Sequence, residues 1–141
     1  MLDLRLVLDT NILVSALIKG GGLQRTTFLL AITKPARLYV SQPILAEYAN
    51  VLARPELGIR RGARLQLLDL IRNRGIQIAP RIRLNVTSDP DDNIFIECAD
   101  VARADYLITC NQRHFPRYWK STKIITAREF IQVAAPHLLP H

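Results

Sequence analysis

Apolar residues recur along the chain in two alternating patterns: short continuous runs and longer segments with helical spacing. The continuous runs are typical of strands buried in a parallel sheet. They cover residues 4–9, 36–41, 76–78, 106–109 and 123–126. Segments with helical spacing cover residues 11–19, 23–33, 43–53, 61–74, 91–103 and 127–135. Strands that alternate with helices predict βαβ units, so we expect an α/β fold with helices on both faces of a mostly parallel sheet of about four to five strands.

Glycine and proline mark the ends of several predicted elements. Three glycines at 20–22 end the first predicted helix, and Gly75 closes the helix over 61–74. Residues 79–91 form a connection that contains two prolines. The sequence contains no repeat, low-complexity tract or evident linker, so its 141 residues are expected to form a single domain, 1–141.

Composition narrows the class of protein. The hydrophobic content of 49% argues against disorder. No apolar run approaches the length of a membrane span, and the N-terminus lacks the features of a signal peptide, so we expect a cytoplasmic protein with no membrane partner. Cys98 and Cys110 lack CxxC spacing, and the three histidines do not complete a zinc pattern. Neither a disulfide framework nor structural zinc is therefore expected.

The net charge of +7 is unevenly distributed along the chain. Between Arg54 and Arg83, eight arginines stand against two acidic residues, which gives this segment a charge of +6. Between Asp89 and Asp105 the sign reverses, with six acidic residues and one arginine. A basic segment beside an acidic cluster suits a polyanion that is held near bound cations. A solvated basic helix, or one that docks on an acidic partner, accounts for the basic segment equally well.

Asp9, Thr10 and Asn11 stand where the first predicted strand ends and the first predicted helix begins. All three residue types serve as helix N-caps, and capping is the simpler interpretation of the tripeptide by itself. In open parallel sheets, however, ligands bind beyond the carboxyl ends of the strands. The carboxylate of Asp9 is therefore also a candidate ligand, and a cap residue can free a neighbouring side chain for that purpose.

A second acidic group, Asp89-Pro90-Asp91-Asp92-Asn93, opens the helix predicted over 91–103. An ordinary helix start accounts for it, with an acidic N-cap, proline at the first position and acids in the first turn. Three carboxylates within four positions also repel one another, and a divalent cation such as Mg²⁺, which takes carboxylate oxygens, would relieve that repulsion. The sequence leaves both interpretations open.

Two further segments carry candidate chemistry. Glu47 lies in a predicted helix, where a glutamate is usually solvated, so by itself it indicates little. The segment ITCNQRHFPRYW, residues 108–119, combines basic and aromatic side chains, a composition that suits phosphates and bases. The alternative is a loop whose Phe115 and Trp119 cover the core. A lone histidine, His114, is weak evidence for a general acid.

The order of these signals resembles the PIN-domain ribonuclease family, and within it the toxin-type (VapC-like) subgroup of prokaryotic toxin–antitoxin systems. The matching phrases are DTNILVSAL, SDPDDNIFIECA, ADYLITCNQRHFP and ITAREFI, which together cover nearly the whole chain. The resemblance implies a three-layer α/β/α sandwich and an endoribonuclease whose acidic residues hold Mg²⁺ or Mn²⁺. It also implies an antitoxin protein as partner, and a homodimer.

The resemblance also implies which residues form the site. The catalytic residues would be Asp9, Glu47, Asp92 and Asn111, with the first three as metal ligands. Supporting or substrate-orienting roles would fall to Thr10, Asn11, Asp89, Asp91, Glu97, Thr109, Arg113 and His114. Many family members carry aspartate at the position of Asn111, whose amide offers an oxygen but no charge. This departure puts a second metal site in doubt, and Glu97 is a candidate to compensate for it.

The expected function is therefore a metal-dependent endoribonuclease that acts on RNA as the toxin of a toxin–antitoxin pair. The main alternative is a PIN-like module that binds RNA or protein through a weakened metal site. A phosphatase of the aspartyl-phosphate type would need a second aspartate where this chain has Asn11. A nucleotide-binding Rossmann domain is disfavoured because the glycines at 20–22 follow a helix rather than a strand.

Overall fold

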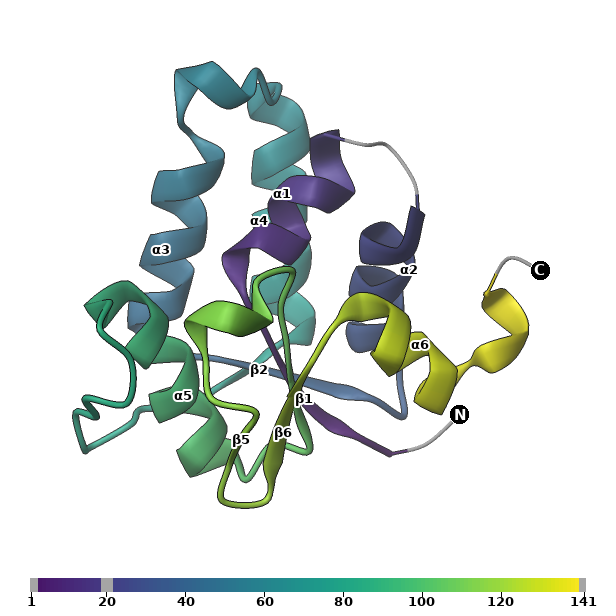
Figure 1. Cartoon of the computed structure of the whole chain (residues 1–141). Helices are drawn as coiled ribbons and strands as arrows, with labels where there is room; N and C mark the ends of the chain where they lie inside the picture. The colour runs from purple at the N-terminus through teal and green to yellow at the C-terminus, as the bar shows by residue number, and fades with distance from the viewer. Residues whose placement is uncertain (1–2, 19–21, 140–141) are drawn as a thin grey trace.

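A six-stranded sheet forms the centre of the structure, a computed structural model that describes residues 3–18 and 22–139 (Figure 1). The strand order is β3–β2–β1–β4–β6–β5, and every neighbouring pair is parallel except β5 and β6. The strands are β1 (Arg5–Leu8), β2 (Arg37–Val40), β3 (Ile76–Gln77), β4 (Tyr106–Ile108), β5 (Tyr118–Trp119) and β6 (Thr122–Ile125). The mostly parallel sheet is as predicted, whereas the sixth strand, β5, lies where the sequence pattern predicts none.

Helices flank this sheet in two packed groups. They are α1 (Thr10–Ile18), α2 (Gly22–Ala31), α3 (Gln42–Leu52), α4 (Arg61–Arg74), α5 (Pro90–Ala102) and α6 (Ala127–Ala134). Short 3₁₀ turns are η1 (Pro55–Leu57), η2 (Gln112–His114) and η3 (Pro136–Leu138). Helix α2 packs on α1 and α6, while α3 packs on α4 and α5, and the predicted α/β sandwich is confirmed. None of the helices in the described ranges has the length and apolar character needed to cross a bilayer.

Helix ends differ from prediction by one or two residues, with one larger correction. Gly22, predicted to help terminate the first helix, is instead the first residue of α2 and has a φ of 84°. The other two glycines of that group, Gly20 and Gly21, lie outside the described residues. Helix α2 ends at Ala31 rather than at residue 33, because the chain tightens where the N–H of Thr33 donates to the carbonyl of Leu30.

The core explains why polar residues gather at one edge of the sheet. Strand β1 lies between β2 and β4, and Leu6, Val7 and Leu8 are fully buried, as expected for a central parallel strand. The carboxyl ends of the parallel strands meet at the same edge. The residues that follow β1, β2, β4 and β6 are Asp9, Ser41, Thr109 and Thr126. Ser41 and Thr126 cap α3 and α6, which leaves Asp9 and Thr109 as the polar pair beside the centre of the sheet.

Candidate active site

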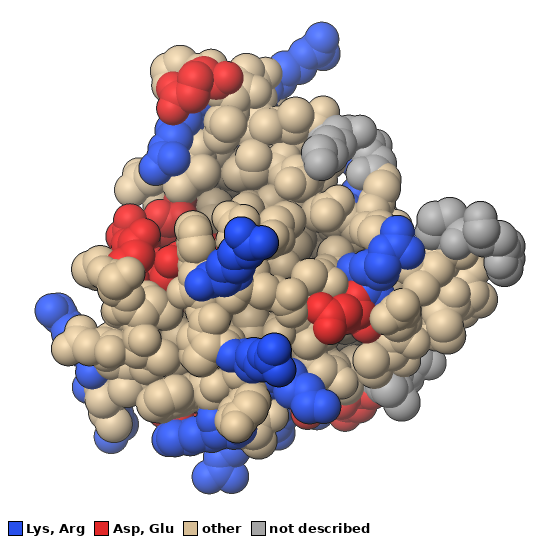
Figure 2. Space-filling view, viewed as in Figure 1, with Lys and Arg blue, Asp and Glu red and all other residues tan. Residues whose placement is uncertain are grey.

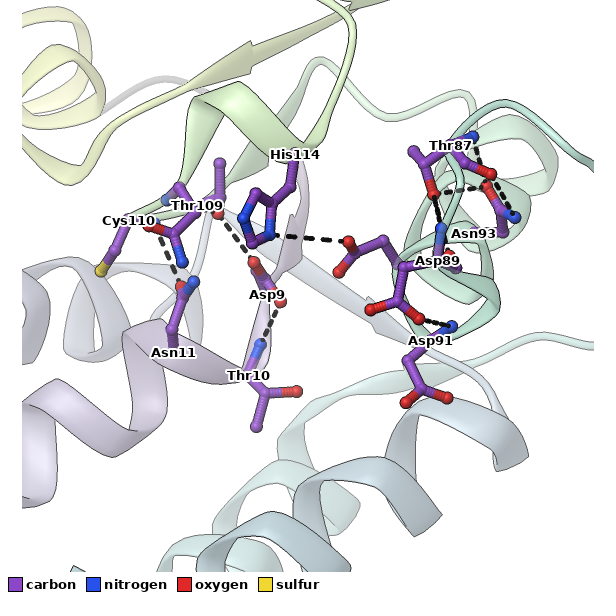
Figure 3. A network of polar contacts seen from close by, with 12 residues as sticks. Asp9, Thr10, Asn11, Thr87, Asp89, Asp91, Asn93, Thr109, Cys110 and His114 are labelled. Atoms are coloured by element: carbon purple, nitrogen blue, oxygen red, sulfur yellow. Dashed lines mark hydrogen bonds and ion pairs between the residues drawn. The ribbon is translucent and has the colours of Figure 1, made fainter.

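Asp9 lies at the end of β1 and is almost completely buried, with 6% of its surface exposed. Two hydrogen bonds fix the position of its carboxylate. Its Oδ1 accepts the N–H of Thr10 at 2.8 Å, and its Oδ2 accepts the hydroxyl of Thr109 at 2.7 Å (Figure 3). Burial raises the pKa of the Asp9 carboxyl, the two hydrogen bonds oppose that rise, and the charge of Glu47 adds to it. The capping interpretation and the site interpretation are thus compatible, because one oxygen supports the helix start while the group faces the site.

Glu47 reaches the same place from α3. Its Oε2 accepts the hydroxyl of Thr10 at 2.8 Å, so a single hydrogen bond connects it to the residue that follows Asp9. The next residue, Tyr48, is fully buried and donates its hydroxyl to the carbonyl of Leu8 at 2.5 Å. Sequence reasoning did not single out Tyr48 as a site residue. It ties α3 to the end of β1 and thereby positions Glu47 beside Thr10.

Asn11, Thr109 and Asn111 connect the ends of β1 and β4. Asn11 Oδ1 accepts the N–H of Cys110 at 3.0 Å, and the Thr109 hydroxyl that donates to Asp9 accepts the N–H of Asn111 at 3.0 Å (Figure 3). Asn111 is therefore linked to Asp9 through the hydroxyl of Thr109, and the side chain of Asn111 is exposed. These hydrogen bonds fix the end of β1 and the end of β4 relative to each other.

The acidic start of α5 faces this edge. Asp89 is the N-cap of α5, and its side chain accepts the N–H of Asp91, as the helix-start interpretation predicts. Asp92, one residue further, lies 3.7 Å from the imidazole Nδ1 of His114 and keeps only 16% of its side chain exposed. Burial, the carboxylates of Asp9 and Asp89 and, to a smaller degree, that of Asp91 raise the pKa of Asp92 to about 6, and His114 opposes the rise. The negative charge of Asp9 thus acts on the carboxyl group of Asp92, although the two residues come from different elements of the fold.

Asn93 is a residue that sequence reasoning missed. It is 4% exposed, and its Oδ1 accepts both the N–H and the hydroxyl of Thr87, at 2.8 and 3.0 Å. Its Nδ2 donates to the carbonyl of Thr87 (Figure 3). A signal was present, since asparagine in the first turn of a helix competes with the backbone unless a nearby loop takes its hydrogen bonds. Asn93 holds the loop before α5 against the helix that carries Asp92.

We expect Asn93→Ala to lower the free energy of unfolding by about 1–3 kcal/mol, because Thr87 would lose three hydrogen bonds in a half-buried position. Chemical denaturation of the variant measures this change. Asn73→Ala, on the exposed face of α4, is the matched control and should stay within about 0.5 kcal/mol of the parent. An equal effect of both substitutions would contradict the role of Asn93.

A hollow of about 580 Å³ opens beside these acids. It is lined by Val86, Thr87, Ser88, Asp89, Asp92, Arg113, His114, Phe115 and Pro116. The lining therefore combines two carboxylates with an arginine and a histidine, and His114 lies beside Asp92. Phe115 is also 8% exposed and part of the core, so the loop interpretation of this segment holds for Phe115 at the same time.

The side chain of Glu97 points toward the loop before α5 and not toward the other acids. Its Oε2 accepts the N–H of Leu84 at 2.8 Å, and the residue lines a separate hollow together with Arg81 and Arg83. The carboxylate thus supports the loop before α5 and has no described bond to Asp9, Glu47 or Asp92. The sequence suggested that Glu97 could compensate for Asn111, and its geometry gives no support to that interpretation.

The oxygen-rich donor set fits a hard divalent cation such as Mg²⁺ or Mn²⁺. The charge of Asp9 raises the pKa of Asp92, and Glu47 is joined to Thr10 by a hydrogen bond. Among residues 3–18 and 22–139, no three His, Cys, Asp or Glu side chains stand as close together as metal ligands do. Asp9, Glu47 and Asp92 are the residues that would hold an ion.

Residues 5–113 match the model of the PIN domain, which covers more than half of the chain. The protein belongs to the PIN-domain family. The chain is also similar to the uncharacterized protein MJ1680 of Methanocaldococcus jannaschii, with 29% identity over 93% of this chain and 92% of that protein. Among solved structures it is similar to VapBC2 from Rickettsia felis bound to a DNA fragment from their promoter. That match has a TM-score of 0.58 and 17% identity, and it covers 86% of this chain and 98% of the other. At that identity, the likeness establishes the shared fold alone.

Membership supports a nuclease in general terms, because PIN domains are generally nucleases that use divalent metals. The PIN domain of this chain carries an acidic edge in the place where its sheet geometry puts a ligand site.

Proposed function

We propose that this PIN domain is a metal-dependent endoribonuclease that hydrolyses phosphodiester bonds of RNA in the cytoplasm. The observation that carries the proposal is the gathering of three acids at the carboxyl edge of the sheet. Asp9 is bonded to Thr109, Glu47 is bonded to Thr10, and Asp92 lies beside His114. When bound there, Mg²⁺ or Mn²⁺ would supply Lewis-acid stabilisation of the phosphate and a water of lowered pKa.

The residues of the chain would divide the remaining work. Thr10, Thr109 and the Asn11–Cys110 bond orient the Asp9 carboxylate and the strand end that carries it. Arg113 and His114 line the same hollow as Asp89 and Asp92, and there they would bind the phosphates on either side of the cleaved bond. Asp89 and Asp91 add negative charge around Asp92, which favours a cation and disfavours an uncompensated anion.

The test is cleavage of a mixed pool of structured RNAs by the purified protein with Mg²⁺, with Mn²⁺ and with EDTA. Cleavage that requires metal supports the nuclease. RNA binding without cleavage under any metal would instead favour a PIN-like binding module with a weakened site. The uncharged Asn111 at a position where many family members carry aspartate is the observation that favours this second candidate.

A toxin of a toxin–antitoxin pair, working as a homodimer with an antitoxin protein as its partner, is the biological role we propose. The fold that it shares with VapBC2, together with the resemblance of its motifs to toxin-type members, supports this role. Induced expression should arrest growth of a bacterial host, and co-expression of the product of an adjacent small gene should relieve the arrest. Growth that continues despite cleavage-competent protein would contradict the toxin role while leaving the nuclease intact.

Asn111→Asp is expected to tighten Mn²⁺ binding by about tenfold or more, because a carboxylate near Asp9 adds a full charge to the ligand set. Calorimetric titration with Mn²⁺ measures the change. Asn73→Asp on α4 adds the same charge at a distant exposed position and should leave the affinity within about twofold. Unchanged affinity of the Asn111→Asp variant would exclude this position from the metal site.

A further inference from the structure

A second hollow, of about 630 Å³, adjoins the acidic one. Its lining includes Arg113, Arg117, Tyr118, Lys123 and Glu129, and we call it the Tyr118 groove. Arg113 and Pro116 line both hollows, so the two share a wall. A ligand that occupies the hollow beside Asp92 and His114 therefore meets the Tyr118 groove where it extends past Arg113.

The register of the sheet edge puts an aromatic ring beside a cation in this groove. In the antiparallel pair of β5 and β6, Tyr118 stands opposite Lys123, and Trp119 stands opposite Thr122. Directly opposed residues project from the same face, so Tyr118 and Lys123 lie side by side. Trp119 projects to the other face, where its indole N–H donates to Asp100. Strand β5 is the outermost strand, which leaves the Tyr118 ring at the open margin of the sheet.

The two adjacent aromatic residues thus have different roles. Trp119 is half-buried and held by Asp100, with the ammonium group of Lys120 over its ring. Tyr118 is 66% exposed, and within the part of the chain that the structure describes it makes no hydrogen bond or ring contact. Packing explains Trp119, whereas nothing in the described fold needs a large aromatic ring at position 118.

The basic side chains of the groove also lack ion-pair partners within the described residues. Arg113, Arg117 and Lys123 are exposed, and none of them forms an ion pair within residues 3–18 and 22–139. The acid in the groove, Glu129, is occupied: its Oε1 accepts from Thr126 in the capping box of α6 and from Gln112 Nε2 at 2.9 Å. On the face shown in Figure 2, basic side chains lie over the region of η2, β5 and β6, beside the acidic side chains near α5.

We propose that the Tyr118 groove binds the single-stranded RNA that flanks the cleaved phosphodiester bond. In this assignment a base stacks on the Tyr118 ring, and Arg117 and Lys123 neutralise the neighbouring phosphates. Stacking requires an unpaired base, so the groove selects single strands over duplex RNA. An acidic segment of a protein would use the cations but would not need the ring. This inference rests on the proposed function, since it assumes RNA at the acidic edge.

The test is fluorescence anisotropy of a labelled single-stranded RNA of about 12 nucleotides, in EDTA so that the full-length protein binds without cutting. Tyr118→Ala should weaken binding by about fivefold or more through lost stacking, whereas Tyr118→Phe, which keeps the ring, should stay within about twofold. Arg117→Ala should weaken binding and lower the slope of log affinity against log salt by about one. The paired hairpin of the same RNA should bind more weakly to the parent protein and show no dependence on Tyr118.

Arg25→Ala, an exposed arginine on α2 outside the arginine-rich segment, is the matched control for Arg117→Ala and should leave affinity and salt slope unchanged. Arg64→Ala, on α4, tests the arginine-rich segment itself. A loss of binding in Arg64→Ala but not in Arg117→Ala would overturn the proposal. So would RNA binding that ignores Tyr118 while an oligo-glutamate peptide loses affinity in Arg117→Ala, because the groove would then fit an acidic protein segment. An RNA cleavage assay with Mn²⁺ distinguishes failure of the groove proposal from failure of the proposed nuclease function. If the parent cleaves RNA and the groove variants bind RNA normally, only the groove proposal is overturned. If RNA binding depends on the groove residues but no cleavage occurs, only the nuclease function is overturned.

Discussion

Asp9→Asn and Asp92→Asn are each expected to reduce metal-dependent RNA cleavage by at least about 100-fold, since even residues that only support metal ligands often cost 10- to 100-fold. Each substitution removes one negative charge from two carboxylates that repel each other electrostatically. The amide preserves the size of the side chain, and an amide at position 9 can still accept the N–H of Thr10. The loss should therefore come from the chemistry of the site and not from unfolding.

Initial rates of RNA cleavage with Mn²⁺ measure this loss, and thermal melting monitored by circular dichroism checks the fold. Asp69→Asn is the matched control because Asp69 lies on α4 with an exposed side chain that contacts Arg72 only at 3.9 Å. It should cleave at the parent rate. If Asp9→Asn and Asp92→Asn also cleave at the parent rate, the acidic edge is not the catalytic centre, and the cutting activity must belong to another surface or to a contaminant.

Much of the fold could be predicted because its determinants are local. The continuous run at Leu6–Leu8 becomes a fully buried central strand, and the arginine-rich stretch before Gly75 becomes α4 with the predicted bounds, Arg61–Arg74. Strand β5 could not be predicted in the same way. It has two residues, and its strand geometry comes from pairing with β6, so hydrophobic periodicity carries no signal for it.

The convergence of the site was predictable from topology, whereas its supporting contacts were not. Asp9 and Thr109 both follow parallel strands, and adjacency of β1 and β4 brings their side chains to 2.7 Å. The roles of Glu97 and Asn93 depend on the path of the loop over 79–89, which sequence patterns leave open. Glu97 faces Leu84 and Asn93 faces Thr87, although both residues lie on the same helix as Asp92. The catalytic roles of Asp9, Glu47 and Asp92 are predictions that the variants test.

Segment 108–119 shows how one stretch satisfies two interpretations. Phe115 is buried and Trp119 is held by Asp100, which accounts for two of its aromatic residues by packing. His114 and Tyr118 remain exposed, one beside Asp92 and the other in the adjoining groove. The sequence could not divide these residues between core and surface, because that division depends on the strand register of β5.

A second large effect is expected in stability: metal-free protein should become less stable as the pH rises from about 4 to about 7, and Asp92→Asn should remove part of that loss. The pKa of Asp92 is about 6 in the folded protein against 3.8 in its ordinary state, so the folded state holds this proton more tightly than the unfolded state does. Stability from the protonated group is therefore fully present below pH 3.8 and is lost as the pH rises through about 6. The difference corresponds to at most about 3 kcal/mol before solvent screening.

Chemical denaturation of parent and Asp92→Asn in EDTA, at about pH 4 and about pH 7, measures this contribution as a difference between the two proteins. At the lower pH their stabilities should nearly coincide, because a protonated carboxyl and an amide are both neutral. At the higher pH the variant should be more stable by about 1–2 kcal/mol, since it lacks the charge that Asp9 and Asp89 repel. A variant that is less stable than the parent at the higher pH would show that the Asp92 carboxylate is favourable in the metal-free fold.

Addition of Mn²⁺ at about pH 7 should then reverse the order of the two proteins. An ion that binds only the folded state at 100 times its dissociation constant stabilises it by about 2.7 kcal/mol, and this gain requires the ionised Asp92. The parent should therefore melt at a higher temperature with Mn²⁺, while Asp92→Asn should respond little. A charge that destabilises the empty fold and stabilises the ion-bound fold belongs to a residue retained for binding and not for packing. Equal responses of the two proteins to Mn²⁺ would assign the ion to a different set of ligands.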